Sequence, residues 1–355
     1  KISGTLPGST EEIIMLISLD GSTAGGQFVR TAVALSAITG NAIKIINIRG
    51  SRDPPGLKVQ HMEGINAIAQ LCNAHVKGLE LNSSELIFKP GQLDGKDLNI
   101  EISTAGSIGL VLQALLLVTA HLDKSIKITF KGGGTWNKWA PPVCYLEKVL
   151  FPLIGEKTNI KIIREGFYPK GGAEVQVITK PMRFKEIFLE HAGEMRDIKC
   201  ISVAAEVLKK SMVAERQAQA IENIVKEKFS KPFSKEILYS PSLCPGSGVL
   251  IVVHTDNSIL GSDAIGERRK AAEEVGKEAM RFLVSSLGKG AVDIHAGDML
   301  LPYMAFAGAG RISVPTISHH MLMNINVLQK MLDIRFNIKG NKGEPGIIEV
   351  VGVKP

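Results

Sequence analysis

The feature that most constrains the fold of this chain is an order of elements that occurs three times. Short apolar runs between turn residues predict strands, and longer runs with apolar residues every three or four positions predict helices. The predicted order in each copy is strand, helix, strand, helix, strand, strand, over about 60 to 80 residues. The copies cover residues 13–89, 98–179 and 295–351.

The expected elements alternate regularly within each copy. In the first copy they are 13–20, 27–39, 42–48, 58–72, 76–81 and 85–89. In the second copy they are 98–102, 108–122, 125–131, 141–154, 159–163 and 173–179. In the third copy the turn 295–298 precedes 299–307, 311–315, 320–332, 334–338 and 346–351.

A sheet that carries its helices on one face can bury its apolar side only against neighbouring units. We therefore predict an α+β fold of three βαβαββ repeats packed with their helices inward. Residues 186–289 do not follow the repeat, and their strands and helices predict a smaller inserted α/β domain. The expected division is a large domain, 1–185 and 290–355, and an inserted domain, 186–289.

Composition supports a folded chain with a mostly aliphatic core. Hydrophobic residues make up 45% of the 355 residues and aromatic residues only 5%. The net charge of +7 and the pI near 9.1 fit an acidic partner such as nucleic acid, although a basic solvated surface gives the same numbers.

The four cysteines are far apart and lack the spacing of a zinc site, so we expect small buried thiols. The most apolar run, 108–122, is shorter than the roughly 20 residues of a membrane span. The first residues show no apolar signal-peptide core. We expect a cytoplasmic protein with no membrane partner.

Two loops could bind phosphate. The segment LDGSTAGGQFVR, 19–30, joins a strand to a helix through a Gly-rich turn, where backbone N–H groups and the helix dipole favour anions. It lacks the ending of a Walker A motif, and a purely structural turn is equally consistent. The segment NIRGSRDPPGLKVQH, 47–61, brings Arg49, Arg52, Lys58 and His61 onto or beside one loop, which is either a phosphate grip or a solvated basic loop.

The loop KGGGTWNKWAPP, 131–142, contains both tryptophans of the chain. Its aromatic and proline surfaces could stack on a base or could cover the core. The segment GFYPKGG, 166–172, predicts a bent hairpin with exposed aromatics. Neither segment specifies a function alone.

The last candidate segments are 293–310 and SHHMLMN, 318–324. His295 and Asp298 have the spacing of metal ligands, but no third ligand is evident. His319 and His320 open a predicted helix, where a histidine can cap, pack or react.

Eight segments in this order resemble the RNA 3′-terminal phosphate cyclase family. They are LDGSTAGGQFVRTAVALSAITG, IRGSRDPPGLKVQH, AGSIGLVLQALL, GGGTWNKWAPP, REGFYPKGG, GERR, HAGDMLLPYMAFAGAG and SHHMLMN. The resemblance covers nearly the whole chain. It implies three βαβαββ repeats with an inserted α/β domain, in agreement with the order of elements above.

The resemblance also implies a reaction. A histidine attacks the α-phosphate of ATP and is adenylylated, and AMP then passes to an RNA 3′-phosphate end. The neighbouring 2′-hydroxyl attacks the activated phosphate, giving a 2′,3′-cyclic phosphate and AMP. The family's nucleophile lies four residues before an Asn, here Asn324, which selects His320 over His319.

The same resemblance implies two binding sets and a divalent metal, Mg²⁺ or Mn²⁺. The positions expected to hold ATP are Gln113, Pro141, His295, Ala296, Gly297, Asp298 and Met299. His295 and Pro141 would stack on opposite faces of the adenine. The positions expected near the phosphates of ATP and of the RNA end are Arg30, Arg49, Arg52, Gln60 and His61.

The chain departs from the family pattern at three places. Its Gly-rich loop is two residues shorter and lacks the usual Glu, Met299 replaces a Gln, and His295 replaces an aromatic residue. Metal use and nucleotide preference are therefore open. Two other functions are weighed: a non-catalytic RNA-binding or ribosome-assembly relative, which would lack His320, and an enolpyruvyl transferase, whose fold is built from similar repeats.

Overall fold

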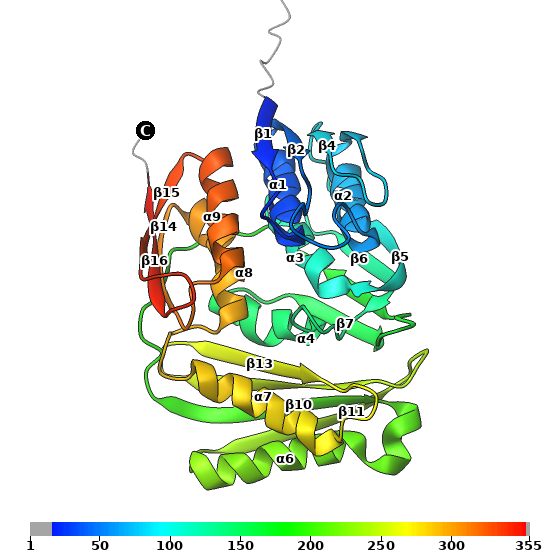
Figure 1. Cartoon of the computed structure of the whole chain (residues 1–355), viewed down its shortest axis with the longest axis vertical. Helices are drawn as coiled ribbons and strands as arrows, with labels where there is room; N and C mark the ends of the chain where they lie inside the picture. The colour runs from blue at the N-terminus through cyan, green and yellow to red at the C-terminus, as the bar shows by residue number, and fades with distance from the viewer. Residues whose placement is uncertain (1–15, 353–355) are drawn as a thin grey trace, which may run out of the picture.

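The computed structural model describes residues 16–352 and contains helices and several small sheets (Figure 1). The expected mixed α and β character is confirmed. The first expected strand, 13–20, begins outside the described residues, as does the segment from which the lack of a signal peptide was predicted. Within 16–352 no helix is long and apolar enough to cross a membrane.

Three of the sheets share one strand order along the chain, in which the first and second strands pair in parallel and the fourth and then the third strand follow as antiparallel neighbours. The first sheet contains β1 (Leu16–Asp20), β2 (Ala42–Ile46), β4 (Leu86–Lys89) and β3 (His75–Lys77). The second contains β5 (Leu98–Ser107), β6 (Lys127–Gly134), β8 (Glu174–Ile178) and β7 (Asn159–Arg164). The third contains β9 (Ile187–Leu189), β14 (Ala309–Val314), β16 (Gly346–Gly352) and β15 (Ile334–Lys339).

Helices that follow the strands of these sheets pack against one another between them (Figure 1). They are α1 (Gly26–Thr39), α2 (Val59–Cys72), α3 (Ile108–Thr119), α8 (Ile294–Ala307) and α9 (His319–Met331). The interior is aliphatic, as the composition predicts, with Leu35, Leu112, Leu300 and Leu328 fully buried. Burying these side chains is the main stabilising contribution of the central helices.

The helical segment that follows β6 of the second sheet is irregular. It consists of α4 (Val143–Tyr145), a π-helical turn, η1 (Leu146–Leu150), and α5 (Phe151–Leu153). The expected single helix 141–154 is therefore present but contains a π-turn. Its buried residues Tyr145 and Phe151 are among the largest in the core.

The fourth sheet contains β11 (Phe233–Ser240), β10 (Met195–Ala205), β12 (Ser247–Thr255) and β13 (Ile259–Ile265). Helices α6 (Val213–Lys228) and α7 (Ala272–Ser286) cover one face and form a core of their own. The other face packs on the large core through Ile201, Val203, Leu250 and Val252. A short 3₁₀ helix, η2 (Glu206–Ser211), leads into α6.

Two expected boundaries differ from the structure. Strand β9 lies inside the range 186–289 given to the inserted domain, yet it pairs with β14 in the third sheet. Helix α8 begins at Ile294 rather than at residue 299, because the Asp293 carboxylate accepts the backbone N–H groups of His295 and Ala296 and caps the helix there. The segment 295–298 is therefore the first part of a helix and not a turn before one.

Candidate active site

His320 lies in the first turn of α9, and its side chain is exposed. The Ser318 hydroxyl starts the helix by accepting the backbone N–H of Met321 at 2.9 Å. The neighbouring His319 is tied down, since its Nε2 lies 2.8 Å from the carbonyl oxygen of Thr23 and must donate to it. Of the two adjacent histidines, His320 is the one whose ring stays available.

The Gly-rich turn between β1 and α1 presents an uncapped helix N-terminus. Asp20 closes the turn by accepting the Ser22 N–H and the Asn47 amide. The N-cap residue of α1 is Gly25, and within residues 16–352 no side chain caps the helix. The first backbone N–H groups of α1 are therefore left for another acceptor, and the helix dipole adds positive potential there. This is the local geometry of an anion site.

Gly25 places this N-terminus directly against His320. A Cβ at position 25 would stand 3.2 Å from Cε1 of His320 and 3.9 Å from Nη2 of Arg52. The imidazole and the guanidinium thus flank the start of α1. An anion bound there is within reach of both side chains.

His61 lies on the other side of the same turn. A Cβ at Gly26 would stand 2.1 Å from Nε2 of His61, so only glycine fits at position 26. Nδ1 of His61 accepts the backbone N–H of Lys58, which leaves the ring proton on Nε2. Burial, followed by the charges of Arg30, Arg49 and Lys58, lowers the pKa of His61 to about 3. The neutral ring therefore directs an N–H toward the start of α1.

The three predicted arginines have different surroundings. Arg30, on α1, is only 6% exposed, and burial lowers its pKa to about 10, so it remains a cation at neutral pH. Within residues 16–352 no carboxylate pairs with it. Arg52 is exposed, whereas Nη1 of Arg49 donates to the carbonyls of Pro54 and Gly56 at 3.3 and 2.8 Å. Arg49 therefore holds the loop closed.

The electrostatics favour an uncharged imidazole at residue 320. Partial burial lowers the pKa of His320, and the charges of Arg52, His319 and Arg30 lower it further. A neutral imidazole keeps the lone pair that a nucleophile needs. Gln60 contacts the second sheet instead, where its Oε1 accepts the Ser107 N–H at 3.1 Å.

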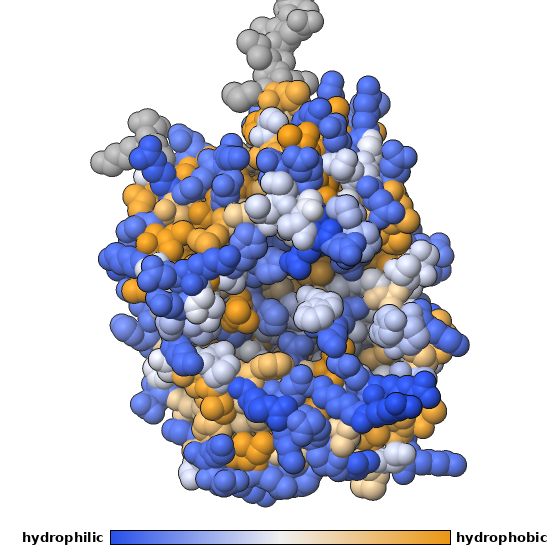
Figure 2. All heavy atoms as spheres, in the orientation of Figure 1, coloured by the Kyte–Doolittle hydropathy of each residue, from blue (hydrophilic) through white to orange (hydrophobic). Residues whose placement is uncertain are grey.

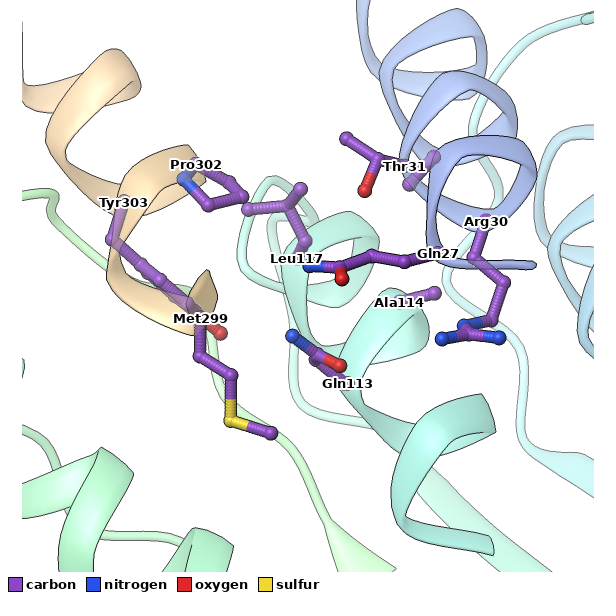
Figure 3. Close-up of a pocket in the computed structure, with 10 residues that line it drawn as sticks. Gln27, Arg30, Thr31, Gln113, Ala114, Leu117, Met299, Pro302 and Tyr303 are labelled. Carbon is purple, nitrogen blue, oxygen red and sulfur yellow. The ribbon is translucent and has the colours of Figure 1, made fainter. Parts of the chain in front are cut away.

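The residues expected to hold ATP are spread over α3, α8 and the loop before α4. Gln113 and Met299 line a small pocket together with Arg30 (Figure 3). His295 is half-buried, and its ring lies edge-on to Tyr145 with the centroids 5.8 Å apart. Pro141 is buried beside the start of α3 and does not line that pocket.

The other expected ATP positions are packing residues of α8. Ala296 is fully buried, and a Cβ at Gly297 would stand 2.4 Å from Cε of Met321, so glycine allows α8 and α9 to approach. Asp298 accepts the Ser318 hydroxyl at 3.0 Å, and burial raises its pKa to about 7. Asp298 thereby joins α8 to the cap of the helix that carries His320.

Comparison with known proteins decides the family. The sequence model described as RNA 3′-terminal phosphate cyclase matches residues 22–338. The RNA 3′-terminal phosphate cyclase of Thermococcus gammatolerans is 43% identical over 94% of this chain and 98% of its own length. That of Methanopyrus kandleri is 38% identical, over 94% of this chain and 98% of its own length.

The chain belongs to the RNA 3′-terminal phosphate cyclase family. The resemblance drawn from the eight segments is confirmed, as is the expectation of an enzyme. A solved enolpyruvyl transferase, NikO from Streptomyces tendae, aligns with a TM-score of 0.33 and 10% identity over 94% of this chain and 47% of its own. That likeness is too distant to inform fold or function.

The Gly-rich turn of this chain lacks the Glu that the family pattern places there, and with it one possible metal ligand. Nowhere in residues 16–352 do three or more His, Cys, Asp or Glu side chains cluster as metal ligands would. The nearest carboxylate of the turn, Asp20, already accepts two hydrogen bonds. The described residues therefore offer no ready-made cluster of protein ligands, and the expected Mg²⁺ or Mn²⁺ stays a prediction from the resemblance.

Sequence reasoning missed two groups of this site. Gln27, Pro302 and Tyr303 line the pocket of Gln113, and within the described residues the Tyr303 hydroxyl has no hydrogen-bond partner (Figure 3). Asp263, on β13, lies 3.6 Å from Nε2 of His295, and burial raises its pKa to about 6. Gln27 stands in a quoted segment and could have been found there. Asp263 stands in the inserted segment and carries no local signal.

Proposed function

We infer that this chain converts an RNA 3′-terminal phosphate to a 2′,3′-cyclic phosphate at the expense of ATP, with His320 as the covalent nucleophile. One observation supports this most strongly. The exposed His320 ring lies against the uncapped N-terminus of α1, with Arg52 beside it. A nucleophile and an anion site therefore share one surface.

The first step is transfer of AMP to the protein. A lone-pair nitrogen of His320 attacks the α-phosphorus of ATP, an N–P bond forms, and the bond to the β-phosphate oxygen breaks. Pyrophosphate leaves with the electron pair. The N–H groups of α1, Arg52 and the buried cation of Arg30 stabilise the developing charge, since such transfers depend mainly on positioning and electrostatics.

The second and third steps activate and close the RNA end. An oxygen of the RNA 3′-phosphate attacks the phosphorus on His320, the N–P bond breaks, and an RNA-(3′)pp(5′)A end forms. The adjacent 2′-hydroxyl then attacks the RNA phosphorus and loses its proton. The bond to AMP breaks, which leaves the 2′,3′-cyclic phosphate and free AMP.

The architecture proposed with this function is three βαβαββ repeats and an inserted domain. The common strand order of three sheets supports the repeats, and the separate core of α6 and α7 supports the insertion. Since β9 pairs with β14, we place the insertion after the first strand of the third repeat, from about residue 190 to 289 rather than from 186.

The reaction is tested with an RNA oligonucleotide labelled in its 3′-terminal phosphate. Incubated with ATP, the wild type should give a product whose label resists phosphatase, and His320→Ala should give none. His319→Ala is the matched control and should retain turnover. Equal turnover in His320→Ala would contradict the proposal. Salt-sensitive RNA binding without any product would instead support the non-catalytic RNA-binding alternative.

A further inference from the structure

A large cleft lies where the start of β12, with helices α6 and α7, meets the loops of the second sheet. Its volume is about 1290 Å³, and its walls include the loop 136–140, the loop 167–169 and the segment 265–272. Gln60 and Ser107 also line it. Gln60 is also one of the positions expected near the phosphates, and the next residue, His61, faces the start of α1, so one end of the cleft lies close to the proposed active site.

Two aromatic rings in this cleft face solvent. Trp139 is 86% exposed and Tyr168 is 79% exposed, and both line the cleft. Large aromatic side chains are rarely left this open. Rings that project into a cleft are platforms on which nucleic-acid bases stack.

Buried neighbours fix the loops that carry these rings. A Cβ at Gly248 would stand 2.3 Å from Cε3 of Trp136, and one at Gly246 would stand 2.1 Å from Cγ of Phe167. Trp136 and Phe167 therefore pack tightly against the start of β12. The Asn137 amide also donates to the carbonyl of Ala105 at 2.8 Å. The two loops that carry the exposed rings are thus anchored to the rest of the fold.

The cleft wall carries four cationic side chains, Lys138, Arg216, Arg268 and Lys270. Among the described residues Arg216 pairs with Glu273 and Lys270 with Glu278, whereas Arg268 has no carboxylate within 4 Å and stays available for a phosphate. Lys138 pairs with Glu267 at 3.1 Å and also lies 5.5 Å from the centre of the Trp139 ring. In Figure 2, strongly hydrophilic side chains gather over α7 and the segment before it, below a hollow in the same face. Stacking rings beside cations match a single-stranded nucleic acid.

We propose that the cleft binds the single-stranded RNA segment just upstream of the 3′-phosphate, with bases stacked on Trp139 and Tyr168 and the backbone facing Arg268. This inference rests on the proposed cyclase function for the identity of the strand. None of the positions expected to hold ATP lines the cleft, so RNA and ATP would reach His320 from different sides.

Equilibrium binding without ATP tests the cleft independently of catalysis. The probe is a series of 3′-phosphorylated RNA oligonucleotides of increasing length. Wild-type affinity should rise with length until the cleft is filled. Trp139→Ala and Tyr168→Ala should each weaken binding of a long oligonucleotide by about tenfold and flatten the length dependence. Phe188→Ala is the matched control, because Phe188 is 61% exposed on β9 and does not line the cleft.

Two further variants test whether weaker binding is merely a folding defect and whether the bound partner is a nucleic acid. Trp139→Phe should keep affinity while losing the fluorescence quenching that stacking on Trp139 causes. Arg268→Ala should lower the slope of log affinity against log salt by about one, and Arg335→Ala, on β15, should leave it unchanged. Affinity independent of length and of both rings would overturn the proposal, as would loss of His320 adenylylation in Trp139→Ala. RNA binding that depends on Trp139 and Tyr168 in a protein that shows no AMP transfer would support the RNA-binding cleft and overturn the cyclase function.

Discussion

At the scale of single residues, the contacts distinguish an arginine that is free to bind a ligand from one that supports its own loop. Arg52 is exposed beside His320, whereas Arg49 hydrogen-bonds two backbone carbonyls and has a positive φ of 52°. Both stand in one basic loop, and from sequence they are equivalent. Only the contacts tell them apart.

We expect Arg52→Ala and Arg49→Ala to fail in different ways. Arg52→Ala should slow adenylylation on the order of 100-fold with almost unchanged stability, because it removes a cation from the anion site. Arg49→Ala should in addition cost about 1–2 kcal/mol of folding free energy, since two hydrogen bonds from a charged donor are lost. Single-turnover labelling and urea unfolding measure the two effects. Equal destabilisation by both substitutions would contradict this assignment.

The pH dependence of His320 follows from its neighbours. Burial, followed by the charge of Arg52, lowers the pKa of His320 below the ordinary value of an imidazole, so the reactive neutral form predominates at pH 7. The rate of adenylylation should be flat near neutral pH and should fall with acid through a midpoint below 6.5. Arg52→Ala should move that midpoint upward, since a nearby cation is removed. A wild-type midpoint above 6.5 would refute the account.

At the scale of elements, regular helices can be predicted from sequence, whereas helix starts and very short strands are easily missed. The periodic helices α1, α2 and α9 are predicted within one or two residues. The start of α8 is missed although Asp293 is a favourable N-cap residue, because its glycine and polar positions hide the helical period. Strand β9, with only three residues, has too little pattern to be seen. The contact of Gly25 with His320 joins positions 295 residues apart and follows only from tertiary packing.

The link between α8 and α9 gives a prediction at this scale. Burial raises the pKa of Asp298 to about 7. Between about pH 4 and pH 7 this carboxyl is therefore protonated in the folded chain and ionised in the unfolded chain. Stability from this group therefore falls as pH rises through that window. Asp298→Asn, which can still accept from Ser318, should add about 1–3 kcal/mol at pH 8 and roughly a third of that gain at pH 5.

Urea unfolding at pH 5, 7 and 8 measures this difference. The exposed Asp123→Asn serves as control and should show no such gain. If Asp298→Asn destabilised the protein equally at all three pH values, the carboxyl would not be titrating as its burial implies. The gain is expected at the cost of activity, because Asp298 supports the helix of His320.

At the scale of the whole molecule, the Asp293 carboxylate connects three parts of the chain through hydrogen bonds. Its carboxylate caps α8, accepts the Tyr145 hydroxyl at 2.7 Å and accepts the Gly261 N–H of the fourth sheet at 2.7 Å. This single buried side chain helps fix the fourth sheet relative to the active site. It also holds His295 near Asp263.

Asp293→Ala should therefore cost about 3–5 kcal/mol of folding free energy, since buried donors from three elements lose their acceptor. Thermal unfolding measures the loss, and the exposed Asp333→Ala is the control. A loss below about 1 kcal/mol would show that water or a neighbouring group replaces the carboxylate readily.

We propose that the His320 imidazole accepts AMP, and the position and acid lability of a label on the protein test this proposal. The protein is incubated with ATP labelled in its α-phosphate, kept at alkaline pH, digested and mapped by mass spectrometry. We predict one adenylyl group per chain, on His320, lost in acid, absent in His320→Ala and retained in His319→Ala. AMP on any other residue, or an unlabelled wild type, would contradict the account.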